Sequence, residues 1–211
     1  MIKGPGQPGF LAPFSDKGGL YVAQAIARDD TQWANPGALG LAGFGLNTIL
    51  LQIHNIGLID GTLPLIYGFF WGGIAQIIAG LIDARRGDTF GLTAFTSYGL
   101  FWIGLSFGFL LQWLGLITLD GPGLAWLCIC WGIFTGYMTI GTFRISYLHV
   151  FVFATLTILF FLLAAHFYGV LPAIVPGIEG IFCGAAAAYG SAAVVLNAKF
   201  GREVFPLGTI T

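Results

Sequence analysis

The sequence predicts an all-α integral membrane protein: a six-transmembrane-helix bundle with both termini in the cytoplasm. Of its 211 residues, 57% are hydrophobic and only 8% are charged, whereas a soluble domain carries about 25% charged residues. A helix needs about 20 apolar residues to span a bilayer. Six apolar runs approach or exceed this length, at residues 36–58, 64–82, 90–114, 122–139, 147–168 and 176–198.

The basic residues all fall on one side of this six-span map. They lie before the first run, between the second and third, between the fourth and fifth, and after the sixth: Lys3, Lys17, Arg28, Arg85, Arg86, Arg144, Lys199 and Arg202. The three other connections contain no Lys or Arg. Because cytoplasmic loops are enriched in these residues, the distribution places both termini in the cytoplasm and supports the number of spans.

The spans leave little sequence for a soluble domain. Residues 1–33 are rich in Gly and Pro and are expected to form a flexible cytoplasmic N-terminal arm. Residues 34–200 form the six-helix transmembrane domain, and residues 201–211 a cytoplasmic C-terminal tail. The runs are too long and too apolar for barrel strands, which alternate over about 10 residues. We therefore expect a multi-pass protein of the cell (plasma) membrane, with the lipid bilayer as its surroundings.

Glycine pairs spaced four residues apart recur in four of the spans. They are Gly68 and Gly72, Gly104 and Gly108, Gly132 and Gly136, and Gly180 and Gly184. Small residues at this spacing form a groove on a helix in which another backbone can approach closely. The pattern predicts a tightly packed bundle that assembles into an oligomer.

The first span opens with the sequence Asn35-Pro36-Gly37. Asn35 is suited to the N-cap and Pro36 to the first helical position. A helix N-terminus has free amide donors and positive potential, which suit a carboxylate or phosphate. Ordinary capping at the membrane surface explains the same residues.

Polar side chains within the spans are candidates for lining a pathway, since polar groups at membrane depth are costly. The best candidates are Asn47, Gln76 and Ser97, and hydrogen bonding between helices is the alternative for each. Glu179 is the one charged residue within a predicted span, near its outer end. It is a candidate proton-binding group or a wetted carboxylate in a first helical turn. His54 and His166 are weaker proton-relay candidates.

Catalytic and cofactor-binding patterns are missing from the sequence. The three cysteines, Cys128, Cys130 and Cys183, lie within spans and predict neither a disulfide framework nor a metal site. The sequence has no phosphate-binding Gly-x-x-x-x-Gly-Lys-Ser/Thr loop. A net charge of −1 gives no indication of a nucleic-acid partner. We therefore expect neither an enzyme nor a bound cofactor or metal.

Five stretches together resemble the acetate uptake transporter family, also called the succinate–acetate permeases. They are residues 35–51 (NPGALGLAGFGLNTILL), 72–81 (GGIAQIIAGL), 86–98 (RGDTFGLTAFTSY), 151–160 (FVFATLTILF) and 196–208 (LNAKFGREVFPLG). The first departs from the usual Asn-Pro-Ala-Pro-Leu-Gly-Leu by Gly37 and Ala38. The resemblance implies a homo-hexamer of six-helix subunits, each with its own pathway.

The resemblance also implies particular site residues. A hydrophobic constriction would be formed by Phe44, Tyr98 and Leu156, with the Tyr98 hydroxyl passing the carboxylate across. Ala187 falls where the family sets room for larger substrates. Further pathway positions on the matching stretches and spans are Asn35, Pro36, Gly40, Asn47, Gln76, Thr93 and Ser97.

The expected function is membrane transport of acetate and related small carboxylates, including succinate. Transport as an anion channel and transport as a proton-coupled carrier both remain open. One alternative is a channel for another small solute such as ammonium. Another is a membrane sensor or structural subunit.

Overall fold

The computed structural model describes residues 33–210, so the predicted N-terminal arm lies almost wholly outside the described residues. Within this range, six helical segments are long and apolar enough to cross a membrane, which confirms the predicted span count. They are α2 (Gly37–Asn55), a rod made of α3 (Thr62–Tyr67), η1 (Gly68–Ala75) and α4 (Gln76–Arg85), then α5 (Thr89–Trp113), α6 (Gly121–Thr142), α7 (Tyr147–Phe167) and α8 (Ile174–Phe200).

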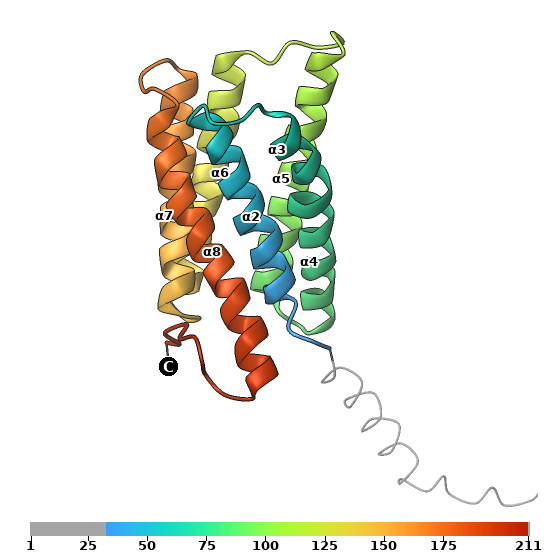
Figure 1. The fold of residues 1–211 in the computed structure, drawn as a ribbon, viewed down its shortest axis with the longest axis vertical. Coiled ribbons are helices and arrows are strands. Elements are labelled where there is room, and N and C mark those ends of the chain that lie inside the picture. Colours follow the sequence, from blue (N-terminus) through green and yellow to red (C-terminus); the bar gives the residue numbers. More distant parts are fainter. Residues whose placement is uncertain (1–32, 211) are drawn as a thin grey trace, which may run out of the picture. The chain divides into compact units, whose positions relative to one another are not determined.

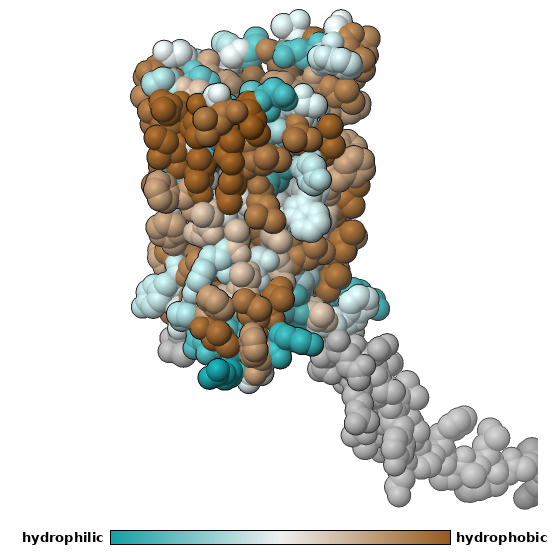
Figure 2. Space-filling view, viewed as in Figure 1, coloured by the Kyte–Doolittle hydropathy of each residue, from teal (hydrophilic) through white to brown (hydrophobic). Residues whose placement is uncertain are grey.

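The bundle is an elongated cylinder whose helices run roughly along its long axis (Figure 1). Its most extensive helix contacts join α2 to α8, α6 to α7, and α5 to the α3–η1–α4 rod. The start of α2 and the C-terminal end lie at the same end of the bundle (Figure 1). Apolar side chains cover much of the visible face, and hydrophilic residues gather toward its two ends (Figure 2).

Polar side chains set the first residue of three helices. Asp88 caps α5 by accepting a hydrogen bond from the Gly91 amide at 3.0 Å, and Asp120 caps α6 through the Gly123 amide at 2.7 Å. Ser146 caps α7 in the same way. Such side chains satisfy amide groups that lack a partner within the helix. At the C-terminal end of α8, Gly201 adopts a left-handed conformation with φ of 63°, which favours glycine.

The glycine pairs play unequal parts within the subunit. Gly45 of α2 faces Gly184 of α8, and a Cβ atom on either would lie 2.6–2.7 Å from the carbonyl oxygen of the other. The backbones therefore approach as closely as the spacing predicts. In contrast, a Cβ atom on Gly104 would meet no atom within 4 Å among the described residues. The predicted close packing thus holds for α8 but not for this position of α5.

The second span contains a π-helix, η1, that the sequence did not predict. It covers Gly68–Ala75 and joins α3 to α4 without a break. Its glycines admit close neighbours: a Cβ atom on Gly72 would lie 2.9 Å from the Trp102 ring. π-Helical turns are rare and frequently occur at functional sites. Here the turn ends immediately before Gln76, one of the candidate pathway residues.

The C-terminal segment folds back across the end of the bundle. The Asn197 side chain accepts hydrogen bonds from the Val204 and Phe205 amides at 2.7 and 2.9 Å and donates to the Phe205 carbonyl at 2.8 Å. An isolated bridge then pairs Thr209 with Ser146 at the start of α7. The predicted tail is therefore ordered through residue 210 and closes one side of the bundle end.

Candidate functional site

Two cavities enter the bundle from its opposite ends. The distal cavity, about 320 Å³, is lined near its mouth by His54, Gly61 and His166. The proximal cavity, about 310 Å³, lies at the end that holds the start of α2 and the C-terminus, and is lined near its mouth by Asn35, Asp88 and Ser146. Each has the volume of a small-molecule pocket, so the bundle is hollowed from both sides.

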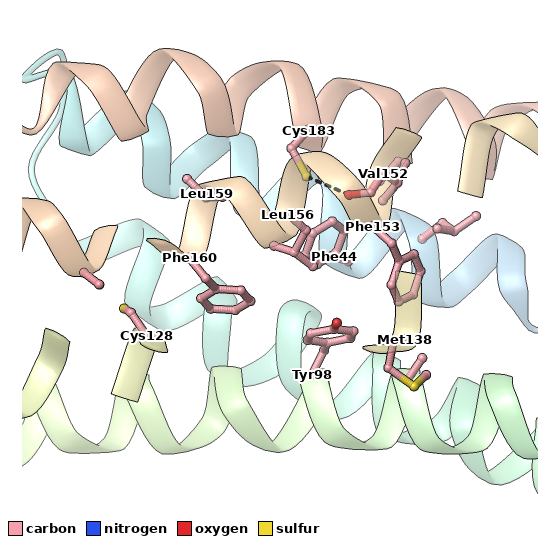
Figure 3. Packing of buried hydrophobic residues seen from close by; sticks show 14 of the residues in the cluster. Phe44, Tyr98, Cys128, Met138, Val152, Phe153, Leu156, Leu159, Phe160 and Cys183 are labelled. Carbon is pink, nitrogen blue, oxygen red and sulfur yellow. Dashed lines mark hydrogen bonds between the residues drawn. The ribbon is translucent and has the colours of Figure 1, made fainter. Parts of the chain in front are cut away.

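Three side chains separate the two cavities. Among the described residues, only Phe44, Tyr98 and Leu156 line both. They are 7%, 4% and 4% exposed, respectively. The rings of Phe44 and Tyr98 have centroids 6.1 Å apart, and Leu156 lies beside Phe44 (Figure 3). The residues that the family resemblance assigns to a constriction therefore meet between the cavities. We call this trio the constriction.

Each member of the constriction comes from a different helix, and its neighbours fix it there. Phe44 on α2 lies between Gly43 and Gly45, which allow the Trp71 carbonyl of η1 and the backbone of α8 to approach. Tyr98 on α5 packs against the rings of Trp131, Phe134 and Phe153. Leu156 belongs to the same buried cluster on α7. Buried contacts of this kind hold the three side chains in place because protein interiors are closely packed.

The Tyr98 hydroxyl is bound to another side chain and does not present a donor to the passage. Its oxygen lies 2.9 Å from Thr135 Oγ1. Thr135 donates its own hydroxyl hydrogen to the Trp131 carbonyl at 2.8 Å. Since a threonine hydroxyl has one hydrogen, Tyr98 must be the donor in the Tyr98–Thr135 bond. The expectation that this hydroxyl passes a carboxylate across is therefore not supported by the geometry.

Two predicted pathway residues line the proximal cavity. Gln76 is fully buried, and its Nε2 donates to the Gly72 carbonyl at 2.6 Å. Its Oε1 has no hydrogen-bond partner within residues 33–210. Asn35 lies at the mouth, where its Oδ1 accepts from the Gly37 amide at 2.9 Å. The N-cap of α2 is Pro36 rather than Asn35, and Gly37 rather than Pro36 is the first helical residue, so the predicted helix start is shifted by one position.

The other predicted pathway residues lie outside both cavity linings: Pro36, Gly40, Asn47, Thr93, Ser97 and Ala187. Asn47 is 2% exposed and faces η1, where its Nδ2 would lie 3.3 Å from a Cβ atom on Gly68. Ala187 is fully buried against Gly45. Both residues therefore lie in contacts between helices. The Asn47 amide makes no hydrogen bond to another described residue, so the stated alternative of hydrogen bonding between helices is not observed for it.

The candidate proton-linked residues lie in different parts of the bundle. His54 and His166 line the distal cavity, and each places Nδ1 within 3.0 Å of a nearby carbonyl, that of Ile59 and Leu171, respectively. Glu179 lies in α8 outside both linings. Its two carboxylate oxygens have no hydrogen-bond partner in the described part of the chain.

Several cavity residues were not singled out as pathway residues from the sequence: Thr48 in the distal cavity, and Asp83, Asp88, Ser146 and His149 in the proximal cavity. His149 Nδ1 lies 2.7 Å from Ser146 Oγ, and Asp83 Oδ1 lies 3.8 Å from Arg86 Nε. Thr48 follows Phe44 by four residues, a spacing that places both on one helix face. That spacing was the available signal for Thr48.

A membrane bundle with a cavity from each end and buried, largely apolar side chains between them has the form of a channel or carrier. No group of three metal-binding side chains occurs in the part of the chain that the structure describes. The arrangement can hold a small solute on either side of these side chains. Its class is therefore that of a multi-pass membrane transport protein.

Comparison with known proteins identifies the family. The GPR1/FUN34/yaaH family matches residues 18–207, and the chain belongs to this family. It is 47% identical to the succinate-acetate/proton symporter SatP of Escherichia coli K12, over 85% of this chain and 97% of that protein. A protein of Methanothermobacter thermautotrophicus is 42% identical over 89% of this chain and 96% of its own length.

A solved structure described as the bacterial acetate channel SatP shares the fold. It superposes with a TM-score of 0.81 at 45% identity and covers 84% of this chain and 100% of its own. The resemblance drawn from the sequence motifs is thereby confirmed. These relatives are a symporter and a channel by name, so the expectation of a membrane transport protein rather than an enzyme is confirmed.

Proposed function

We propose that this protein transports acetate and related small carboxylates, including succinate, through one narrow pathway in each subunit. The observation that carries the proposal is that two cavities from opposite ends share Phe44, Tyr98 and Leu156 as their common lining. The names of the SatP relatives supply the substrate class.

The constriction explains how such a pathway would select its substrate. Apolar side chains at a narrow point exclude water and so block hydrated inorganic ions. Acetate has a methyl group that can contact these side chains and a single polar end. The cavities on either side offer polar groups, such as Gln52 and Asn55 in the distal cavity, to receive that end.

Uptake of labelled acetate into proteoliposomes tests the function. Protein-dependent uptake that unlabelled acetate and succinate reduce, and that chloride leaves unchanged, is the expected result. Uptake no faster than in protein-free liposomes would contradict the proposal. A Phe44→Ala variant with altered acetate flux would further argue against a sensor or structural role.

We further propose that both termini face the cytoplasm of the cell. In this arrangement the N-terminal arm (residues 1–33) and the C-terminal tail (residues 201–211) are cytoplasmic, and residues 34–200 form the transmembrane domain. The one-sided distribution of Lys and Arg supports this orientation. Thr118→Cys and Glu203→Cys provide the test, in a chain whose native cysteines are replaced by alanine. A membrane-impermeant thiol reagent should label the first in intact cells and the second only after lysis, and the reverse pattern would contradict the orientation.

A homo-hexamer is the proposed assembly, as the family resemblance implies. Large apolar side chains and the open Gly104 surface of α5 leave broad faces for contacts between subunits. Native mass spectrometry from detergent should show six copies. A stable monomer that transports acetate would contradict the need for assembly.

Ammonium is the second candidate substrate. A yeast relative named ammonia transport outward protein 2 is 33% identical over 65% of this chain, although the match covers only 52% of that protein. An apolar constriction would also pass neutral ammonia. Reduction of labelled acetate uptake by ammonium at constant pH would favour this substrate, and unchanged uptake would exclude it.

A further inference from the structure

We infer that Leu207, which the C-terminal segment (residues 201–210) carries to the mouth of the proximal cavity, is a further specificity-determining residue that limits the length of the transported carboxylate. The inference rests on the proposed transport function. It concerns selection by size where the pathway opens, apart from the exclusion of inorganic ions at the constriction.

The C-terminal segment forms part of the wall of the proximal cavity. Leu207 and Thr209 line this cavity, whereas every other lining residue lies at or before Val194 in the sequence. The segment runs from the end of α8 to the start of α7, across the end of the bundle (Figure 1). The bridge from Thr209 to Ser146 places the segment beside the mouth of the cavity. Leu207 is half-buried there and is the apolar side chain that the segment adds to the lining.

The backbone around Leu207 is held by the two neighbouring helices. The carbonyls of residues 206, 207 and 208 accept hydrogen bonds from the Tyr189 hydroxyl of α8 and from the Leu148 and Tyr147 amides of α7, at 2.9, 3.3 and 2.8 Å, respectively. The first amides of a helix have no partner within it, so the start of α7 is a favourable position for these carbonyls. The segment therefore presents Leu207 from a fixed backbone.

Contacts on both sides of Leu207 hold the segment against the bundle. The three hydrogen bonds of Asn197 lie on its N-terminal side. On its C-terminal side, the Ile210 amide donates to the Ile145 carbonyl at 3.2 Å. Gly208 has a φ of 66°, and a Cβ atom there would lie 3.0 Å from a ring carbon of the first residue of α7. Glycine at this position thus allows the close approach, and Leu207 has little freedom to move aside.

The position and chemistry of Leu207 favour selection by chain length. Acetate has a single methyl group, whereas a longer acid brings further methylenes to the mouth. The mouth also holds the polar side chains of Asn35, Asp88 and Ser146, so the carboxylate can keep polar partners while the alkyl tail meets Leu207. Contact with an apolar side chain discriminates about tenfold or more between substrates that differ by one methylene. A larger residue at 207 should therefore hinder acetate, and a smaller one should favour longer acids.

Leu207→Trp tests the position in an otherwise native chain. It should reduce protein-dependent uptake of labelled acetate into proteoliposomes several-fold, because the indole ring fills more of the mouth. Leu207→Met, of similar volume, should retain uptake. Val204→Trp is the matched control, since Val204 belongs to the same segment, is 39% exposed and lines neither cavity. Neither Leu207 variant should admit chloride, because the constriction is unchanged.

Leu207→Ala tests the selection by size. The substitution is made in a chain that also carries Leu156→Ala, so that the constriction does not limit the longer acid. The ratio of protein-dependent butyrate flux to acetate flux should then rise about tenfold over that of Leu156→Ala alone. Val204→Ala in the same background should leave the ratio unchanged.

Thiol modification measures the mouth without any transport. Val194→Cys places a thiol in the lining of the proximal cavity, in a chain whose native cysteines are replaced by alanine. In detergent, fluorescein maleimide should react several-fold more slowly when Leu207→Trp is added and several-fold faster when Leu207→Ala is added. The much smaller methyl methanethiosulfonate should react at the same rate in all three chains.

The outcomes separate this inference from the proposed function. Modification rates and flux ratios that do not follow the size of residue 207 would overturn the inference. Equal acetate uptake by wild type and folded Leu207→Trp would also overturn it, even if the modification rates differ. Absence of acetate transport by the wild type would instead contradict the proposed function, while modification rates that follow the size of residue 207 would still place this side chain at the mouth.

Discussion

Leu156 is the constriction residue whose side chain can be shortened most simply. It is 4% exposed and contributes to both cavity linings. Leu156→Ala should widen the passage and admit lactate or longer acids at measurable rates. The buried cavity that it creates should cost about 2–5 kcal/mol of stability. Substrate range is measured by competition against labelled acetate uptake.

Leu148→Ala is the control for this change. Leu148 lies on the same helix and packs against the core, but it lines neither cavity. It should lower stability without altering substrate range. If Leu156→Ala transports acetate normally and still excludes lactate, Leu156 does not set the width of the passage.

Some of the individual site residues could be predicted from the sequence and some could not. The motifs placed Phe44, Tyr98 and Leu156, and helical spacing could have placed Thr48 beside Phe44. The bond from Tyr98 to Thr135 joins positions 37 residues apart in sequence, and no local pattern encodes it. For the same reason the sequence could not show whether Asn47 faces a pathway or a neighbouring helix.

The contact between α2 and α8 leaves no room for a larger side chain at Gly45. A Cβ atom on Gly45 would lie 2.6 Å from the Gly184 carbonyl oxygen and 2.7 Å from the Ala188 amide nitrogen. Gly45→Val should therefore separate the helices and destabilise the protein by about 1–3 kcal/mol. Thermal unfolding in detergent measures the effect.

Gly104→Val is the comparison, since its Cβ would meet no described atom within 4 Å. It should leave the unfolding temperature of the isolated subunit nearly unchanged. Equal destabilisation by the two variants would show that valine in a helix, rather than the α2–α8 contact, causes the loss.

Asn197 holds the C-terminal segment against the end of α8. Its three hydrogen bonds to residues 204 and 205 should protect the backbone around Arg202 from trypsin. Asn197→Ala should release the segment and accelerate cleavage there, as measured by mass spectrometry. Asn55→Ala, at the opposite end of the bundle, should not. Unchanged cleavage in Asn197→Ala would show that other contacts hold the segment.

Hydropathy located the six membrane-spanning helices because apolar length is a direct requirement of the bilayer. The exact ends of the helices depend on capping residues such as Asp120, which make a helix longer or shorter than its apolar run. The π-helix η1 was not predicted, and its contacts with other spans, such as that of Gly72 with Trp102, join residues far apart in sequence. Glycine spacing predicted the close approach of another helix to α8. It could not show which of the glycine-containing helix faces are packed within one subunit.

The whole molecule combines three properties that belong together in a transport protein. The described ends of the chain lie at one end of the bundle (Figure 1), as an even number of spans requires. Cavities enter from both ends, and the apolar constriction lies between them. Composition and charge predicted the spans and their proposed orientation, but the existence of two cavities depends on side-chain packing throughout the bundle.

Whether Phe44, Tyr98 and Leu156 exclude inorganic ions is measured by the selectivity for acetate over chloride in wild-type protein and in Phe44→Ala. Both fluxes are measured in the same proteoliposomes, with folding verified by size-exclusion chromatography. If Phe44, Tyr98 and Leu156 form a seal, the wild type passes acetate and excludes chloride, and Phe44→Ala admits chloride. Unchanged exclusion of chloride in folded Phe44→Ala would contradict the account.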